Sequence, residues 1–406
     1  MRLSMAVALL FLCSSSLRSQ PVSDELLRAK AQQLANDLIL IDTHIDVPDF
    51  VKDKPEDLSH RTPDGEFDFV RAVQGGLDAP FAAIYVPSEE ETKHTAKQYA
   101  DNLIDMVESW VHAWPDKFAL VRMPSDILAH SKRGLVSLPL GMENGAPIEG
   151  KIGNVQYFYD RGIRYITLTH AKDNHICDSS YDTTRTWHGL SPFGKLVVAE
   201  MNRVGIMVDV SHISDDSFYQ VMQISKAPVI ASHSSCRYFT PGFERNMSDE
   251  MIQLLAKNGG TIQINFGSDF LRKEIRDMES RRQKEIAEYL RQNHLKSTDS
   301  SAEAYEQKYE KDHPLPYADV KDVAIHIDHV AKLVGIDHVG IGSDFDGLGD
   351  ALPTGLKDVS QYPNLIYELL KMGYSESDIQ KICSGNIVRV WNEVERVASD
   401  IRAKKL

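Results

Sequence analysis

Histidines and carboxylates recur at the ends of short apolar runs along this 406-residue sequence. The first are His44 and Asp46, separated by one residue at the end of a β-branched run. Side chains two residues apart in a strand point to the same face, so this pair could bind one metal ion. Imidazole and carboxylate ligands without thiolate suit zinc or a related divalent ion better than magnesium. The further candidates at equivalent positions are Glu143, His170, His212, His233 and Asp344.

This set exceeds the needs of one catalytic zinc ion, which usually has three protein ligands. Two metal ions are therefore predicted, with Glu143 as the carboxylate that reaches both. A hydroxide held between metals roughly 3.5 Å apart would be the nucleophile. Ser211 and Ser232 each precede a histidine, but strand alternation turns them away from the site, and the sequence has no Gly-x-Ser-x-Gly elbow. The pattern therefore favours metal-dependent hydrolysis over a serine nucleophile.

The elements that would position these groups are eight short β-branched runs, each followed by a longer helical pattern. Several runs are almost continuously apolar, as expected of strands covered on both faces. Eight such repeats predict a single α/β domain, a (β/α)8 TIM-type barrel of the metal-dependent hydrolase kind, with its active site at the carboxyl ends of the strands. An open doubly wound sheet is the structural alternative. The runs are Leu38–Asp46, Phe81–Pro87, Leu135–Asn144, Tyr165–His170, Ile206–His212, Val229–Ser234, Thr261–Phe266 and Val339–Asp346.

A charged stretch at about residues 268–320 interrupts the alternation of strands and helices between the seventh and eighth strands. Its composition predicts a helical insertion. Loops after strands surround the active site of this fold, so the insertion is either a lid or a solvated face. His326 and His329 follow it at helical spacing within the amphipathic segment Asp322–Leu333. We interpret these two histidines as packing or surface groups.

The amino terminus has the pattern of a secretory signal. Arg2 is followed by the apolar run Met5–Cys13 and then by small polar residues. This run is far shorter than the roughly 20 residues needed to span a bilayer. We expect residues 1–19 to be removed and residues 20–406 to form one exported domain, periplasmic or extracellular, without an integral membrane span.

The composition of the chain excludes some classes of binding partner and site. The chain is 42% hydrophobic and 26% charged, as in folded globular proteins, and its formal net charge of −14 argues against nucleic acid as a partner. After Cys13, the remaining cysteines are Cys177, Cys236 and Cys383, an odd and widely spaced set that predicts neither a disulfide framework nor a cysteine zinc site. The oligomeric state stays open, a homodimer included.

The segments around the candidate residues resemble the membrane dipeptidase family, also called renal-dipeptidase-like or M19 peptidases. They occur in family order from residue 42 to about residue 392. Departures occur at Asn144, where many members have glycine, and in the segment after His170; both put substrate preference in question but leave the metal ligands unchanged. The matching segments are Asp42-Thr43-His44-Ile45-Asp46, Gly141-Met142-Glu143-Asn144-Gly145, Leu168-Thr169-His170, Gly189-Leu190-Ser191-Pro192-Phe193-Gly194, Asp209-Val210-Ser211-His212, Ala231-Ser232-His233-Ser234, Arg245-Asn246-Met247-Ser248-Asp249-Glu250 and Gly342-Ser343-Asp344-Phe345-Asp346-Gly347.

The resemblance implies a zinc-dependent dipeptidase with two zinc ions per chain and a small dipeptide with a free carboxylate as substrate. It implies that His170 polarises the scissile carbonyl, that Arg245 binds the terminal carboxylate of the dipeptide, and that Asp344 transfers protons. Two dications and a donor placed where negative charge develops would stabilise acyl hydrolysis. The implied metal ligands are His44 and Asp46 for one zinc, His212 and His233 for the other, and Glu143 as the bridge.

The alternative function is that of another binuclear amidohydrolase, a deaminase or lactonase, on the same barrel. Such enzymes often use a carboxylated lysine as the bridge, whereas here the role falls to Glu143 and the nearest lysine, Lys172, lies past the fourth strand. The cationic Arg245 also favours a substrate with a free carboxylate. A non-catalytic homologue would have an incomplete ligand set, and this chain has all five expected ligands.

Overall fold

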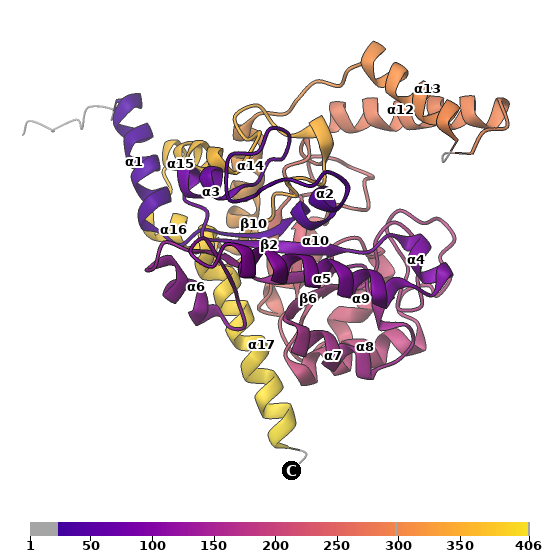
Figure 1. The fold of residues 1–406 in the computed structure, drawn as a ribbon, viewed down its shortest axis with the longest axis horizontal. Helices are drawn as coiled ribbons and strands as arrows, with labels where there is room; N and C mark the ends of the chain where they lie inside the picture. Colours follow the sequence, from indigo (N-terminus) through magenta and orange to yellow (C-terminus); the bar gives the residue numbers. More distant parts are fainter. Residues whose placement is uncertain (1–22, 297–298, 405–406) are drawn as a thin grey trace, which may run out of the picture.

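Eight parallel strands alternate with helices around a barrel in the computed structural model, which describes residues 23–296 and 299–404 (Figure 1). Each strand is hydrogen-bonded to the next in the order given below. Phe345, which lies four residues past the end of the eighth strand, forms a parallel bridge with Ile45 of the first strand and brings the two edges together. The strands are β1 (Ile41–Ile45), β2 (Ala79–Tyr85), β5 (Leu140–Glu143), β6 (Ile163–Thr167), β7 (Met207–Asp209), β8 (Ile230–Ser234), β9 (Thr261–Ile264) and β10 (Val339–Ile341).

The barrel predicted from the sequence is therefore confirmed, and the open doubly wound sheet was the wrong alternative. One predicted run is split by the structure. Pro139 separates β4 (Val136–Leu138), which pairs with β3 (Phe118–Leu120) in a small second sheet, from the barrel strand β5. Proline has no N–H for a ladder hydrogen bond, although its carbonyl still accepts from the backbone N–H of Ala82.

The interior of the barrel below the candidate site is filled by apolar side chains. Phe81 and Tyr165 are fully buried there, with ring centroids 5.5 Å apart. The indole of Trp391, from the last helix, lies 5.5 Å from the Phe81 ring and extends this cluster. Layers of inward-pointing side chains are typical of this barrel, so the interior is a core rather than a pore.

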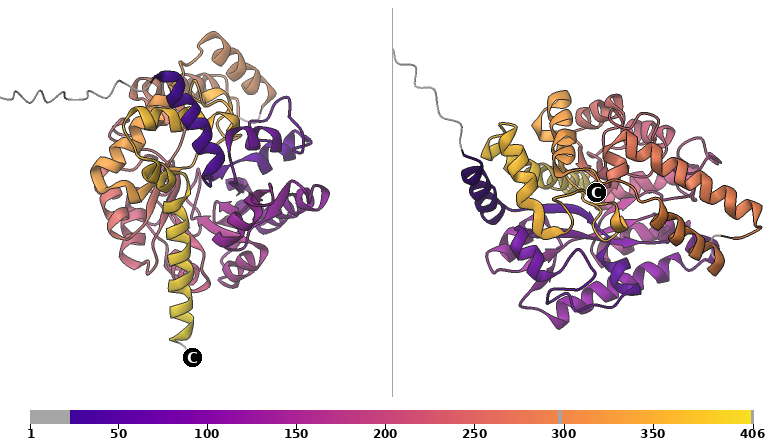
Figure 2. Two further views of the ribbon diagram at one scale, coloured as in Figure 1. Left: turned by 90° about the vertical axis from the view of Figure 1, so that its left-hand side faces the viewer. Right: turned by 90° about the horizontal axis from the view of Figure 1, so that it is seen from above.

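Helices cover the outside of the barrel, and several begin at a serine that caps the first turn. The side chains of Ser191, Ser214 and Ser248 each accept a backbone N–H three residues ahead. Figures 1 and 2 show the last helix running away from the barrel toward the carboxyl terminus. The helices are α1 (Asp24–Asp37), α2 (Val47–Asp53), α3 (Phe69–Gly75), α4 (Ser88–Lys93), α5 (Ala96–Ala113), α6 (Pro124–Ser131), α7 (Gly153–Arg161), α8 (Pro192–Val204), α9 (Asp215–Ile224), α10 (Asp249–Lys257), α11 (Ser268–Leu271), α12 (Lys273–Gln292), α13 (Ser300–Asp312), α14 (Val320–Val334), α15 (Tyr362–Lys371), α16 (Glu376–Gln380) and α17 (Asn386–Ala403).

The predicted insertion is helical and lies between β9 and α14. Helices α12 and α13 form a hairpin that projects away from the barrel in Figures 1 and 2. The rings of Tyr289 and Tyr305 stack with centroids 3.4 Å apart between these helices. The buried residues of the two helices are Ile275, Glu279 and Ala302. The outer part of the hairpin is therefore solvated, and its base contacts the rest of the molecule.

The predicted signal at residues 1–19 lies outside the described residues. Among the helices that are described, none combines the length and apolar character needed to cross a membrane.

Candidate metal centre

The seven candidate histidines and carboxylates all lie at one rim of the barrel, but several strands end earlier than the sequence suggested. His44, Glu143 and His233 lie within their strands, and Asp46 directly follows β1. The other candidates lie three residues past a strand, namely His170 after β6, His212 after β7 and Asp344 after β10. Two of these, His212 and Asp344, have positive φ values of 68° and 67°. A strand cannot continue through this left-handed conformation, which explains the difference.

The carboxylate of Glu143 is the centre of the cluster. Its Oε1 lies 3.0 Å from Nε2 of His212 and 3.2 Å from Nε2 of His233. The same oxygen lies 3.8 Å from Nε2 of His170. Its other oxygen, Oε2, lies 3.5 Å from Nε2 of His44. The two oxygens thus face different histidines, which is the arrangement expected of a carboxylate shared by two metal ions.

The side of the centre next to β1 and β10 is rich in carboxylate oxygens. Nε2 of His44 lies 3.4 Å from Oδ2 of Asp46 and 3.8 Å from Oδ1 of Asp344. This nitrogen is buried and has no hydrogen-bond partner among the protein atoms. A buried imidazole nitrogen without a protein partner, facing several carboxylates, fits a cation placed among them.

The donor set therefore fits metal ions on more than one side of Glu143. In three groups of residues, the possible ligand atoms lie within 4.8 Å of one another. His170 and Asp344 belong to these groups as well, so proximity alone does not separate ligands from catalytic groups. The groups are His44, Glu143 and His233; Glu143, His170 and His212; and His44, Asp46 and Asp344.

Residues behind the histidines, which sequence reasoning missed, orient the rings. The hydroxyl of Tyr165 lies 2.8 Å from Nδ1 of His44, and Oγ of Ser232 lies 2.8 Å from Nδ1 of His233. Ser232 in turn donates to Oδ2 of Asp209 at 2.6 Å. Such contacts fix the ring and leave Nε2 free for a metal. The signal was present in the sequence, since Asp209 interrupts an otherwise apolar strand.

Burial and neighbouring charges shift the pKa values of these groups. Burial alone would raise the pKa of Glu143, but the charges of His44 and His170 and hydrogen bonds from the other histidines hold it well below its usual value. Burial lowers the pKa of His233 to about 3. Glu143 is therefore ionised and His233 is neutral at physiological pH, as metal ligands must be.

Arg245 lies beside the centre and is almost fully buried. Its guanidinium donates to Oγ of Ser234 and to the carbonyl oxygen of His233, both at 2.7 Å. It also lies 5.3 Å from the ring centroid of Phe270. Because a guanidinium carries five N–H donors, those that remain can bind a carboxylate.

Asp346 does not point the same way as Asp344, as it would if strand alternation continued through both residues. Instead, the carboxylate of Asp346 accepts the backbone N–H of Glu66 at 2.7 Å, and Asp346 itself has a positive φ of 65°. Asp344 accepts from the side-chain amide of Asn265 at 2.8 Å and faces His44. Past Ile341 the chain is no longer a strand, so alternation does not apply.

Fold and site together define a barrel hydrolase with a candidate metal centre at the carboxyl ends of its strands. Residues 28–405 match the membrane dipeptidase family, peptidase family M19, and the chain belongs to this family. It is accordingly a dipeptidase, a hydrolase of peptide bonds.

Similar proteins cover nearly the whole chain. Dipeptidase verJ of Clonostachys rogersoniana is 32% identical over 92% of this chain and 89% of its own length. Dipeptidase 3 of Rattus norvegicus is 31% identical over 92% of this chain and 69% of its own length. The crystal structure of the probable dipeptidase PvdM from Pseudomonas aeruginosa is 27% identical, with a TM-score of 0.80 over 92% of this chain and 100% of that chain.

Proposed function

We propose that the chain hydrolyses dipeptides with two zinc ions, held on either side of Glu143. The observation that carries this proposal is the position of the Glu143 carboxylate, one oxygen of which faces His212 and His233 while the other faces His44. Asp46 would complete the first ligand set. Bound zinc ions would supply a hydroxide nucleophile from water and polarise the carbonyl that it attacks.

The residues around the candidate ligands suit the terminal carboxylate of a dipeptide and its scissile bond. Arg245 would bind the terminal carboxylate with the donors that the protein does not use. Nε2 of His170 lies 3.8 Å from Oε1 of Glu143, and the rings of His170 and Tyr85 meet edge to face with centroids 4.8 Å apart. We assign it to the carbonyl oxygen, where it would stabilise developing negative charge.

Asp344 would transfer a proton from the attacking water to the leaving amine. Its Oδ1 faces His44 at 3.8 Å, and its Oδ2 is held by Asn265. A carboxylate fixed at this position can take a proton from the attacking water and deliver it to the leaving amine. Burial and the nearby Asp46 raise its pKa, although His233 opposes this shift, which favours acceptance of that proton.

The sequence also supports a proposal about where the enzyme acts. Residues 1–19 have the pattern of a cleaved export signal, and we propose that residues 20–406 form the exported enzyme, periplasmic or extracellular, acting as a monomer or homodimer. Comparing the amino-terminal sequence of the protein recovered outside the cytoplasm with that of the full chain tests this. Recovery of an intact amino terminus in the cytoplasm would contradict it.

The role of Arg245 offers a sharp test of the substrate assignment. Arg245→Met should raise KM for free dipeptides and remove their advantage over amidated dipeptides, because the buried cation would be gone. The comparison of free and amidated substrates within one variant is independent of how much protein is folded, and Arg245→Lys should retain part of the preference. An undiminished preference for the free carboxylate in Arg245→Met would remove this residue from the substrate site.

A further inference from the structure

A short loop after β10 carries Asp344, the residue assigned to proton transfer. Within this loop, residues 343–347, both Asp344 and Asp346 have positive φ values, 67° and 65°. Aspartate tolerates this left-handed conformation better than most residues, but the conformation still costs free energy. The loop therefore keeps its shape only because contacts around it hold it there.

Glu66 and Asp346 hold this loop through two reciprocal hydrogen bonds. The carboxylate of Glu66 accepts the backbone N–H of Asp346, and the carboxylate of Asp346 accepts the backbone N–H of Glu66 at 2.7 Å. The two residues are 280 positions apart in the sequence. Glu66 lies between α2 and α3, in the connection that follows the first barrel strand. The pair therefore ties this connection to the loop that follows the eighth strand.

The segment that carries Glu66 is itself well anchored. Its neighbour Phe67 is fully buried, with its ring centroid 6.2 Å from that of Phe118. The next residue, Asp68, caps the first turn of α3 by accepting the backbone N–H of Arg71 at 2.8 Å. Glu66 is thus attached to the core and to a helix end, and it can serve as a fixed point for the loop that it contacts.

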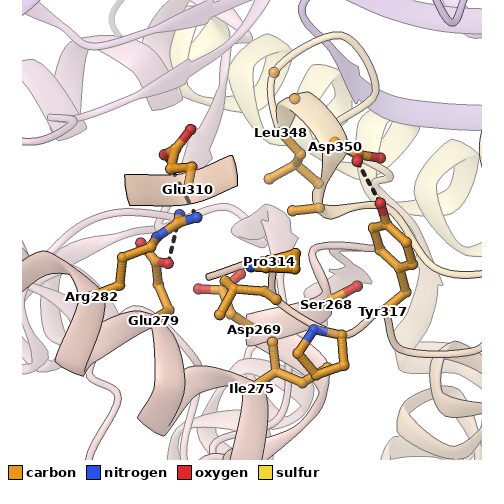
Figure 3. A pocket seen from close by; sticks show the side chains of 15 residues that line it. Ser268, Asp269, Ile275, Glu279, Arg282, Glu310, Pro314, Tyr317, Leu348 and Asp350 are labelled. Atoms are coloured by element: carbon orange, nitrogen blue, oxygen red, sulfur yellow. Dashed lines mark hydrogen bonds and ion pairs between the residues drawn. The ribbon is translucent and has the colours of Figure 1, made fainter. Parts of the chain in front are cut away.

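The chain just after Asp346 has less packing to hold it. Residues 347–351 line a cavity of about 480 Å³, whose other wall is the base of the insertion and the segment 314–317 (Figure 3). Atoms that border a cavity have no partner atoms on that side and lose the attraction that close packing supplies. Hydrogen bonds such as those to Glu66 are therefore more important here than in a packed loop.

A shift of this loop would reach the carboxylates of the candidate centre directly. A Cβ at Gly347 would lie 2.2 Å from Oδ2 of Asp46 and 3.0 Å from Oδ1 of Asp344. The backbone N–H of Gly347 also donates to the carbonyl oxygen of Asp344 at 3.2 Å. The backbone next to Asp346 thus packs against both carboxylates. If the bonds to Glu66 were lost, residues 346 and 347 could move, and Asp344 would move with them.

Building on the proposed role of Asp344 in proton transfer, we propose that Glu66 is a positioning residue for this reaction. Its carboxylate holds Asp346, and through it the loop, so that Asp344 faces the attacking water and the leaving amine. Glu66 acts through Asp344 rather than by touching the substrate. Its loss should therefore lower kcat while zinc content and KM stay nearly unchanged.

Steady-state kinetics on alanyl-alanine with zinc-loaded protein test this proposal. Glu66→Ala removes the acceptor for the N–H of Asp346 and should lower kcat by about 10- to 100-fold, as misplacement of a catalytic group does, with KM within about twofold. Glu66→Gln keeps an acceptor oxygen and should retain near-normal kcat. Burial and the nearby Asp346 raise the pKa of Glu66 to about 8, so a neutral amide also resembles the protonated acid that predominates at neutral pH.

Glu56→Ala is the matched control, because Glu56 stabilises the same connection without contacting Asp346. Its carboxylate accepts the backbone N–H groups of Asp64 and Gly65 at 3.2 and 3.4 Å. This variant should have normal kcat. Glu66→Met fills more of the space than alanine and also lacks an acceptor oxygen, so it should repeat the kcat loss if Glu66→Ala folds poorly. Thermal melting and zinc analysis show which variants are folded and loaded.

Combination with Asp344→Asn tests the route of the effect. In that background Glu66→Ala should lower kcat little further, because the group that Glu66 positions is already gone. Equal losses in both backgrounds, full kcat in Glu66→Ala, no rescue by Glu66→Gln, or an equal loss in Glu56→Ala would overturn the positioning role. Failure of the wild-type protein to cleave any dipeptide, or full kcat in Asp344→Asn alone, would instead overturn the proposed function on which this role rests.

Discussion

Individual side chains behind the candidate metal ligands orient the rings that face Glu143. The phenol of Tyr165 and the hydroxyl of Ser232 contact the Nδ1 atoms of His44 and His233, so that Nε2 of each ring faces Glu143. The contact of Tyr165 could not be predicted from spacing, because Tyr165 lies 121 residues from His44 in the sequence. The ligand types themselves were readable, since polar residues at the ends of apolar strands stand out.

Tyr165→Phe should weaken metal binding without removing a ligand. The substitution deletes only the hydroxyl that orients His44, and loss of such a partner typically costs about 10- to 100-fold in metal affinity. Competition with a chelator measures this change. Tyr159→Phe is the control, because that hydroxyl contacts Glu395 on α17 rather than a ligand of the centre. Equal zinc affinity in wild type and Tyr165→Phe would show that the hydroxyl does not support the ligand.

Substitutions at Asp344 and Asp346 should have different effects and so distinguish the roles of the two residues. Asp344→Asn is expected to keep zinc and near-normal substrate binding while kcat falls by about 10²- to 10⁴-fold, the usual contribution of general acid–base catalysis. Asp346→Asn should act on stability or loop geometry instead, because its carboxylate is engaged with the backbone of Glu66. Steady-state kinetics and metal analysis of both variants show which aspartate acts in catalysis. Loss of zinc in Asp344→Asn would make this residue a ligand, and a rate loss confined to Asp346→Asn would exchange the two roles.

At the scale of elements, the repeating pattern of apolar strands and helices predicted the barrel, its eight strands and the helical insertion. The same pattern predicted several strands to end later in the sequence than they do in the structure. His212 and Asp344 adopt positive φ and therefore lie in loops, a local conformation that apolar patterning does not encode. The break between β4 and β5 could have been predicted from Pro139, but the run around it is almost continuously apolar and was therefore interpreted as one strand.

The outer part of the insertion should be dispensable for folding and for cleavage of small dipeptides. Because Arg282 and Glu310 lie 3.6 Å apart, a short glycine-serine linker can replace residues 284–308 and rejoin α12 to α13. We expect the thermal midpoint to change by no more than about 2–4 °C and alanyl-alanine hydrolysis to persist. Trp391→Ala, in the barrel core, is the contrasting control and should cost about 3–5 kcal/mol. Aggregation or inactivity of the deletion variant would mean that the hairpin belongs to the core or covers the site.

At the scale of the whole molecule, the barrel brings together residues that are 300 positions apart and supports them from below. Trp391 of α17 contacts the ring of Phe81, Phe81 contacts Tyr165, and the Tyr165 hydroxyl reaches His44. The last helix is thereby packed against the same core that positions the candidate ligand His44. The cavity beside Gly347 arises only at this scale, because its walls come from the insertion and from the loop after β10, which no local pattern links.

Titration of the metal-free protein with zinc tests the central claim, a binuclear centre bridged by Glu143. Chelator-treated protein should not cleave alanyl-alanine, and activity should rise with added zinc until two ions are bound per chain, as counted by elemental analysis of the same samples. His212→Ala and His233→Ala should each bind one ion fewer and stay inactive, because each lacks a ligand that nothing nearby replaces. Full activity in protein free of metal, or a plateau at one ion per chain, would contradict the account.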